Sequence, residues 1–199
     1  MENGKGNNNM DARQILCCRK CGLYKNQKPV LDRQVLCDVM WIGLSAKKTN
    51  GYTPLHPDSD TGRIIKKIEM QCTGVNFYKT NLVKCPPVDE SGKLRYPNKQ
   101  EMNACMENLY MEITELKPKL VFLLGNMAAT CICQSLGIPF PKLGGFNYPC
   151  QIHNGVYYIH IHHPSYIHVY KRKMEGEYIK SISGLIKRLM AAVLQERQP

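Results

Sequence analysis

The chain has 199 residues, 43% of them hydrophobic and 22% charged, which is enough to bury one ordinary core without cross-links. No apolar run reaches membrane-spanning length, and the first ten residues are polar rather than apolar like an export signal, so we expect a cytoplasmic, intracellular protein. Lys and Arg outnumber Asp and Glu by 27 to 16, and the resulting net charge of +11 favours a polyanionic partner, nucleic acid first.

The cysteines begin early in the chain. We expect residues 1–10 to be a disordered leader and residues 11–199 to form a single domain that starts with a short helix over 11–16. Cys18 and Cys21 follow at C-x2-C spacing, which lets a tight turn bring two sulfurs to one centre; Cys17 with Cys21 is an alternative pair. Ten cysteines without an export signal indicate buried thiols and metal or cluster ligands rather than a disulfide framework.

An apolar segment, residues 35–42, is a strand candidate that ends at Gly43. A long loop rich in Gly, Pro, Ser and Lys, residues 44–60, separates it from a helical pattern that begins near Thr61. Proteins that alternate strands with helices place their chemistry at the carboxyl ends of the strands. We therefore expect this loop to form part of a site.

The next strand begins near Val75 and delivers two chemically specific residues. Asn81 offers an amide, which presents a donor and an acceptor side by side and so suits the edge of a nucleobase. Cys85 stands just before Pro86-Pro87, where the chain must leave the sheet, and is therefore free to act as a ligand.

The remaining patterns alternate between helix and strand. Helices are predicted over 98–116, 128–136 and 177–195, and strands over 120–124 and 156–161. With the two earlier strands, this order predicts an α/β fold of three layers, in which helices cover both faces of a central four-stranded parallel sheet.

Four cysteines from distant positions form a candidate ligand set: Cys18, Cys21, Cys85 and Cys105. Their spacing differs from that of a zinc ribbon, which uses two similar C-x2-C pairs. Four thiolates gathered in this way suit a [4Fe-4S] cluster, and a four-cysteine zinc site is the alternative.

Several motifs occur together in order: the C-x2-C pair, the strand with Asn81 and Cys85, the helix with Cys105, the segment 117–125, and His163-Pro164-Ser165. Together they resemble the iron-sulfur uracil-DNA glycosylases, families four and five of the uracil-DNA glycosylase superfamily, over roughly residues 18–187. The resemblance implies a uracil-DNA glycosylase-like fold, a [4Fe-4S] cluster, and DNA as the partner of what we expect to be a monomer.

The resemblance also implies roles for individual residues. Asn81 would hydrogen-bond a base flipped out of the DNA, and His163 would stabilise the base anion as it leaves. Pro164 and Ser165 would shape a loop that enters the minor groove, with Tyr166 or Ile167 as the wedge that fills the vacated space.

The first motif departs from family four, which has an acidic residue after the glycine that ends the first strand. Here Gly43 is followed by Leu44-Ser45, which is closer to family five. Pro54-Leu55 stands where the family has an aromatic residue to stack on the base, so Leu55 or Tyr52 is expected to contact it. The residue that holds the attacking water is then Ser45, Asp58 or Asp60.

Basic residues near these motifs are candidate phosphate contacts: Lys47, Lys48, Lys84, Lys93, Arg95, Lys171, Arg172 and Lys173. Two functions remain open. The chain is either a DNA glycosylase of base excision repair, or an iron-sulfur module of the same fold that binds DNA without ordinary base excision.

Overall fold

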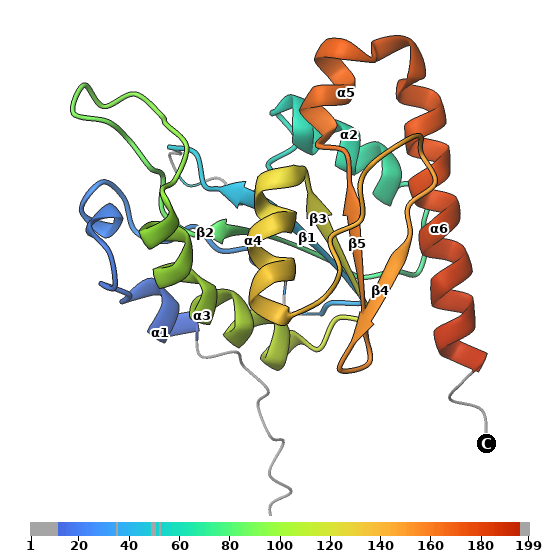
Figure 1. Cartoon of the computed structure of the whole chain (residues 1–199), viewed down its shortest axis with the longest axis horizontal. Coiled ribbons are helices and arrows are strands. Elements are labelled where there is room, and N and C mark those ends of the chain that lie inside the picture. The colour runs from blue at the N-terminus through green and yellow to red at the C-terminus, as the bar shows by residue number, and fades with distance from the viewer. Residues whose placement is uncertain (1–11, 35, 49–50, 52, 196–199) are drawn as a thin grey trace, which may run out of the picture.

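Helices and strands alternate along the chain (Figure 1). The computed structural model describes residues 12–34, 36–48, 51 and 53–195, so the expected leader over 1–10 lies outside the described residues. Five strands are formed: β1 Val39–Ser45, β2 Phe77–Val83, β3 Leu120–Leu124, β4 Cys150–His153 and β5 Val156–Ile161. The helices are α1 Ala12–Leu16, α2 Asp60–Glu69, α3 Lys99–Leu116, α4 Asn126–Leu136, α5 Pro164–Tyr170 and α6 Glu175–Gln195, with short 3-10 turns at Gly22–Lys25 and Arg172–Met174.

The sheet has the order β2-β1-β3-β5-β4, and its first four strands are parallel. The prediction of four parallel strands is therefore confirmed for these four. It missed a fifth strand, β4, which pairs antiparallel with β5. The two strands are joined by Asn154-Gly155, both with positive φ, a turn that favours hairpins. β4 is a half-buried edge strand, and its apolar pattern was too weak to reveal it.

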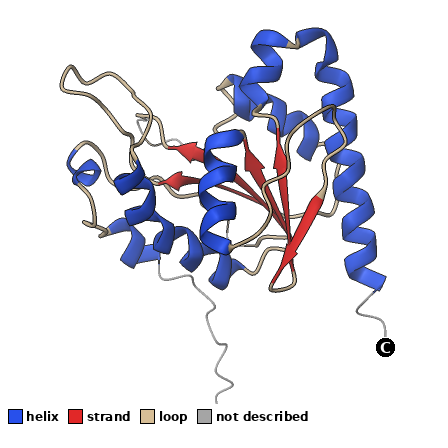
Figure 2. Ribbon diagram, viewed as in Figure 1, coloured by secondary structure: helices blue, strands red, loops and turns tan. Residues whose placement is uncertain are grey.

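Helices cover both faces of the sheet, which confirms the predicted three layers (Figure 2). Because side chains alternate along a strand, Val39 and Trp41 of β1 pack with α2, α5 and α6, whereas Met40 and Ile42 pack with α3 and α4. Among the described residues, no helix is both long and apolar enough to span a membrane.

The first strand differs from its predicted bounds. It begins at Val39 rather than at residue 35, and it continues past Gly43 to Ser45. The extension arises because pairing with β2 persists there, with Gly43 opposite Asn81 and Ser45 opposite Val83.

Lys84 is completely buried, so the prediction that it is a surface cation that contacts phosphate is wrong. Its ammonium donates to Thr80 Oγ1 and to the main-chain oxygen of Asn81, both at 2.7 Å, and it pairs with Glu112 of α3. Glu112 also accepts a hydrogen bond of 2.8 Å from the Tyr78 hydroxyl. Lys84 continues the face of β2 that points toward α3, so its charge requires a buried partner.

Removal of the Glu112 charge should therefore be costly. Glu112→Gln keeps the size of the side chain but leaves Lys84 as an uncompensated buried cation, and we expect it to lower the free energy of unfolding by about 3–5 kcal/mol. Denaturant titration followed by circular dichroism measures this loss.

The control is Glu107→Gln on the same helix, because Glu107 pairs with Lys20 in an exposed position. We expect it to change stability by less than about 1 kcal/mol. Equal effects of the two substitutions would show that the buried pair has no special weight.

Candidate active site and metal centre

The candidate base-binding site is built at the carboxyl ends of β1 and β2. Asn81 is buried, and its Oδ1 lies only 2.4 Å from the point that a Cβ atom on Gly43 would occupy. Only glycine at position 43 lets the amide lie against β1. No described residue hydrogen-bonds the Asn81 side chain, so its donor and acceptor remain available to a ligand.

Leu55 forms a second side of this site. Its Cδ2 lies 3.2 Å from the same Cβ point of Gly43, and its backbone is held in the left-handed region with φ of 51°. The loop can approach α2 because Gly62 has no side chain: a Cβ there would lie 2.3 Å from the main-chain oxygen of Leu55. The sequence analysis did not identify Gly62 as a site residue. The one hint in the sequence was a glycine in the first turn of a helix that follows a long loop.

His163 lies at the end of β5, beside the glycine that ends β3. A Cβ atom on Gly125 would lie 3.1 Å from Cβ of His163, and φ of Gly125 is +81°. The imidazole caps α5: its Nδ1 accepts a hydrogen bond of 3.2 Å from the main-chain N–H of Ser165 and lies 2.7 Å from the Ser165 hydroxyl. An Nδ1 that accepts leaves the proton of a neutral ring on Nε2, which becomes a donor.

The surroundings keep His163 neutral. Burial, and secondly the positive charge of Lys47, lower the pKa of His163 from 6.5 to about 4. The loop after β1 therefore brings Lys47 close enough to His163 to affect its charge. At neutral pH the site contains an uncharged hydrogen-bond donor under the influence of a nearby cation.

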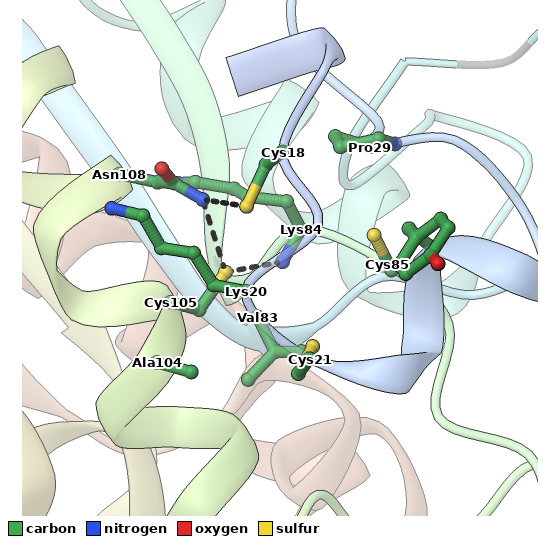
Figure 3. Close-up of a pocket in the computed structure, with 11 residues that line it drawn as sticks. Cys18, Lys20, Cys21, Pro29, Val83, Lys84, Cys85, Ala104, Cys105 and Asn108 are labelled. Atoms are coloured by element: carbon green, nitrogen blue, oxygen red, sulfur yellow. Dashed lines mark hydrogen bonds between the residues drawn. The ribbon is translucent and has the colours of Figure 1, made fainter. Parts of the chain in front are cut away.

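The four predicted ligand cysteines surround one small cavity (Figure 3). Cys18 and Cys21 come from the segment after α1, Cys85 from the end of β2, and Cys105 from α3. Cys17 is exposed and does not line the cavity, so the structure favours Cys18 over the alternative pairing of Cys17 with Cys21.

Polar hydrogens already point at these sulfurs. The Asn108 amide donates to Cys18 Sγ at 3.3 Å and to Cys105 Sγ at 3.8 Å, and the main-chain N–H of Lys84 donates to Cys105 Sγ at 3.4 Å. Such bonds favour the thiolate, the form that ligates metals. Asn108 was not predicted; its spacing of three residues from Cys105 on one helix was the available signal.

Each of the clustered sulfurs makes it harder for its neighbours to ionise. Burial, followed by the neighbouring Cys105, Cys21 and Cys18, raises the pKa of Cys85 to about 12. In the part of the chain that the structure describes, no three Cys, His, Asp or Glu side chains converge as the ligands of one metal ion would. The four thiols line one cavity, and such a four-thiolate set fits a multi-iron cluster or, as the alternative, a zinc ion.

A comparison with models of known protein families identifies the family of the chain. The model of the uracil DNA glycosylase superfamily matches residues 30–184, well over half of the sequence. The chain belongs to this superfamily.

Individual relatives agree. The type-4 uracil-DNA glycosylase of Pyrobaculum aerophilum is 27% identical over 138 residues, which are 67% of this chain and 68% of the relative. That of Archaeoglobus fulgidus is 23% identical over 177 residues, with 84% and 85% of the two chains covered. The crystal structure of SMUG2 from Pedobacter heparinus has a similar fold, with a TM-score of 0.56, 15% identity, and coverage of 78% and 77%.

In this uracil-DNA glycosylase fold, the predicted water-holding residues are separated. Ser45 follows Gly43 by two positions on β1 and so shares its strand face. Asp60 is exposed and pairs with Arg63 and His168, while Asp58 is exposed beside His56. Tyr52 lies outside the described residues.

The predicted DNA contacts also differ in position. Lys47, Lys48 and Arg172 are exposed, whereas Ile167 is completely buried in the core that α2 and α6 share. Tyr166 thus has the exposure that a wedge requires and Ile167 does not. Leu44 packs on the opposite side of the sheet from Gly43, so only its main chain faces the site.

The low pKa of His163 makes stability depend on pH. In the unfolded chain this ring takes up a proton below its ordinary pKa of 6.5, whereas in the folded chain it does so only near pH 4. The contribution of neutral His163 to the free energy of unfolding is therefore fully present above about pH 6.5. It is lost, by up to roughly 3 kcal/mol, as the pH falls toward 4.

Urea titrations between pH 7.5 and 4.5 test this. His163→Gln should reduce the acid-induced loss of stability, although His160 and His162, whose pKa values burial also lowers, retain part of it. An identical pH dependence in the variant and the parent would contradict the assignment.

Proposed function

We propose that the protein is a DNA glycosylase of base excision repair that hydrolyses the N-glycosidic bond of uracil or a related modified base in DNA. The observation that carries the proposal is the buried amide of Asn81, which no described residue hydrogen-bonds and which lies against Gly43, on the same sheet edge as the neutral His163 donor. Membership of the uracil DNA glycosylase superfamily and the names of the type-4 relatives support the same reaction.

Base recognition falls to Asn81. A flipped base enters at the carboxyl ends of β1 and β2, where the amide offers a donor and an acceptor to the edge of the ring. Gly43 sets the position of the amide, and Leu55 supplies an apolar wall next to it. The backbone after β1, including Leu44, completes the contact.

Bond cleavage falls to His163. When the bond between the sugar C1′ and the base nitrogen breaks, its electron pair remains on the base, and positive charge develops on the sugar. The Nε2–H group of neutral His163 donates to the base oxygen on which the negative charge gathers. Because the donor is fixed by the bonds to Ser165 before the reaction, it stabilises the transition state without reorganisation.

Water completes the reaction by adding to C1′ and releasing a proton to solvent. We assign its orientation to Ser45, because Asp58 and Asp60 are exposed and Asp60 is held in ion pairs. A hydroxyl is a weak activator, but positive charge on the sugar makes even neutral water reactive. Lys47 and Lys48 are exposed, and we assign them to phosphates of the bound DNA.

A [4Fe-4S] cluster would be held by Cys18, Cys21, Cys85 and Cys105, with Asn108 and the Lys84 main chain bonded to the sulfurs. When bound, it supplies a covalent tie between the N-terminal segment, β2 and α3. Cys85 lies four residues after Asn81, so this tie would also fix the strand end that recognises the base.

A base-release assay tests the reaction. We expect the protein to release free uracil from DNA and leave an abasic site, and we expect His163→Ala to slow single-turnover release by roughly 100- to 1,000-fold, as for other losses of a fixed donor. Asn81→Ala and Gly43→Ala should act similarly, the latter because its methyl group displaces the amide.

Binding without turnover is the competing function, since the first motif has no carboxylate beside Gly43. A panel of deaminated bases in single- and double-stranded DNA separates the two. Salt-sensitive DNA binding with no base released from any of them would reject the glycosylase and leave the binding module.

Metal analysis tests the cysteine site. Protein purified without oxygen should contain iron and sulfide and absorb visible light, and Cys85→Ser should lose both metal and colour. Cys17→Ser is the matched control, because Cys17 is adjacent to Cys18 but exposed, and it should retain them. If the analysis found zinc and no sulfide, the cluster assignment would be wrong and the cysteines would hold a four-thiolate zinc ion.

A further inference from the structure

Three aromatic rings form a row that starts beside His163 and leads out to the surface. They belong to His162, which precedes the cap of α5, and to Tyr166 and Tyr170 on α5, at four-residue spacing. The rings of His162 and Tyr166 are nearly parallel, with centroids 5.9 Å apart and 13° between planes. Those of Tyr166 and Tyr170 are 5.4 Å apart and inclined by 39°.

The inner end of the row is fixed in the core. His162 Nδ1 lies 2.9 Å from the Tyr148 hydroxyl, the Phe146 ring meets the imidazole at 88°, and the Tyr178 hydroxyl donates to the His162 main-chain oxygen at 2.7 Å. Burial, then Lys171 and His160, lower the pKa of His162, so this ring is neutral at pH 7. It therefore presents a flat, uncharged ring, held by these contacts, to Tyr166.

The outer end of the row is open. Tyr166 is 40% exposed and Tyr170 is 74% exposed. Tyr166 stands between two other rings, which leaves it little freedom to insert into a base stack as a wedge. Among the described residues, the ring of Tyr166 is the only one that contacts the ring of Tyr170, so the row can be extended by one more planar group on its outer side.

Positive charge adjoins this open end. Lys171, Arg172 and Lys173 follow Tyr170 directly, and among the described residues none of these three cations has an ion-pair partner. An aromatic surface next to unpaired cations is the combination that binds single-stranded nucleic acid, through base stacking together with phosphate contacts. A duplex offers the phosphates but hides the faces of its bases.

We propose that Tyr170, held by Tyr166 and His162, is a stacking platform for an unpaired base of single-stranded DNA, while the cations of 171–173 hold the neighbouring phosphates. The inference rests on the proposed function and deepens it, since the row of rings that ends in the unpaired base starts at His162, the neighbour of His163 in sequence. It predicts that the protein prefers single-stranded over double-stranded DNA because of this row of rings.

Binding to DNA that contains no uracil tests the platform without depending on base release. Fluorescence anisotropy with labelled strands should show that Tyr170→Ala weakens binding to a single strand about five-fold or more, the range expected for the loss of one stacked base. Binding to the matched duplex should change less than about two-fold. Tyr170→Phe should bind the single strand like the parent, because stacking needs the ring and not the hydroxyl.

Two controls exclude other causes. Tyr96→Ala removes another tyrosine of similar exposure, 75%, far from the row in sequence, and should leave affinity unchanged. A single strand of abasic sugars offers phosphates without bases, and its affinity should not respond to Tyr170→Ala. An equal loss on single strand, duplex and abasic strand, no loss at all, or a failure of Phe to restore binding would each overturn the proposal.

Discussion

The buried ion pair between Lys84 and Glu112 links the two candidate sites of the molecule. Lys84 bonds the main-chain oxygen of Asn81, and its own main-chain N–H bonds Cys105 Sγ. Glu112 and Cys105 lie on the same face of α3, seven residues apart. Low dielectric makes this pair expensive to separate, so β2 cannot shift against α3 without exposing a bare charge. The Asn81 amide, which we propose recognises the base, and the cysteine cavity are therefore positioned by one buried contact.

Glycines determine the site as much as functional side chains do. Gly43 admits the Asn81 amide, Gly62 admits the loop of Leu55, and Gly125 admits His163. Each is a place where two segments approach so closely that a methyl group would collide or crowd. This explains how a small sheet can bring groups from different strand ends together: the distance between strands is fixed, and the missing side chains supply the remaining space.

Local pattern was enough to predict most of the fold, because α/β segments with full burial on both faces are nearly all apolar, as in Leu120–Leu124. It failed where burial was partial, as in β4, and where a charge was buried, as in Lys84. Nothing in the local sequence distinguishes a lysine that faces phosphate from one that faces Glu112 of a helix 28 residues later. In the site, motif order identified the cavity cysteines, whereas the hydrogen bonds of Asn108 and the burial of Ile167 depend on contacts that only tertiary packing defines.

The sequence His163-Pro164-Ser165 shows how backbone geometry can set a protonation state. Pro164 begins α5 and has no N–H, so the first free donor of the helix belongs to Ser165. That N–H bonds His163 Nδ1, which satisfies the helix end and at the same time confines the imidazole proton to Nε2. Burial then lowers the pKa of the ring to about 4, so at neutral pH the ring keeps one proton, on Nε2, and carries no charge. The same cap fixes the start of α5, and with it the direction in which Tyr166 and Tyr170 leave the site. One capping interaction therefore sets both the proton on His163 Nε2, which we propose faces the base, and the start of the helix that carries Tyr166 and Tyr170.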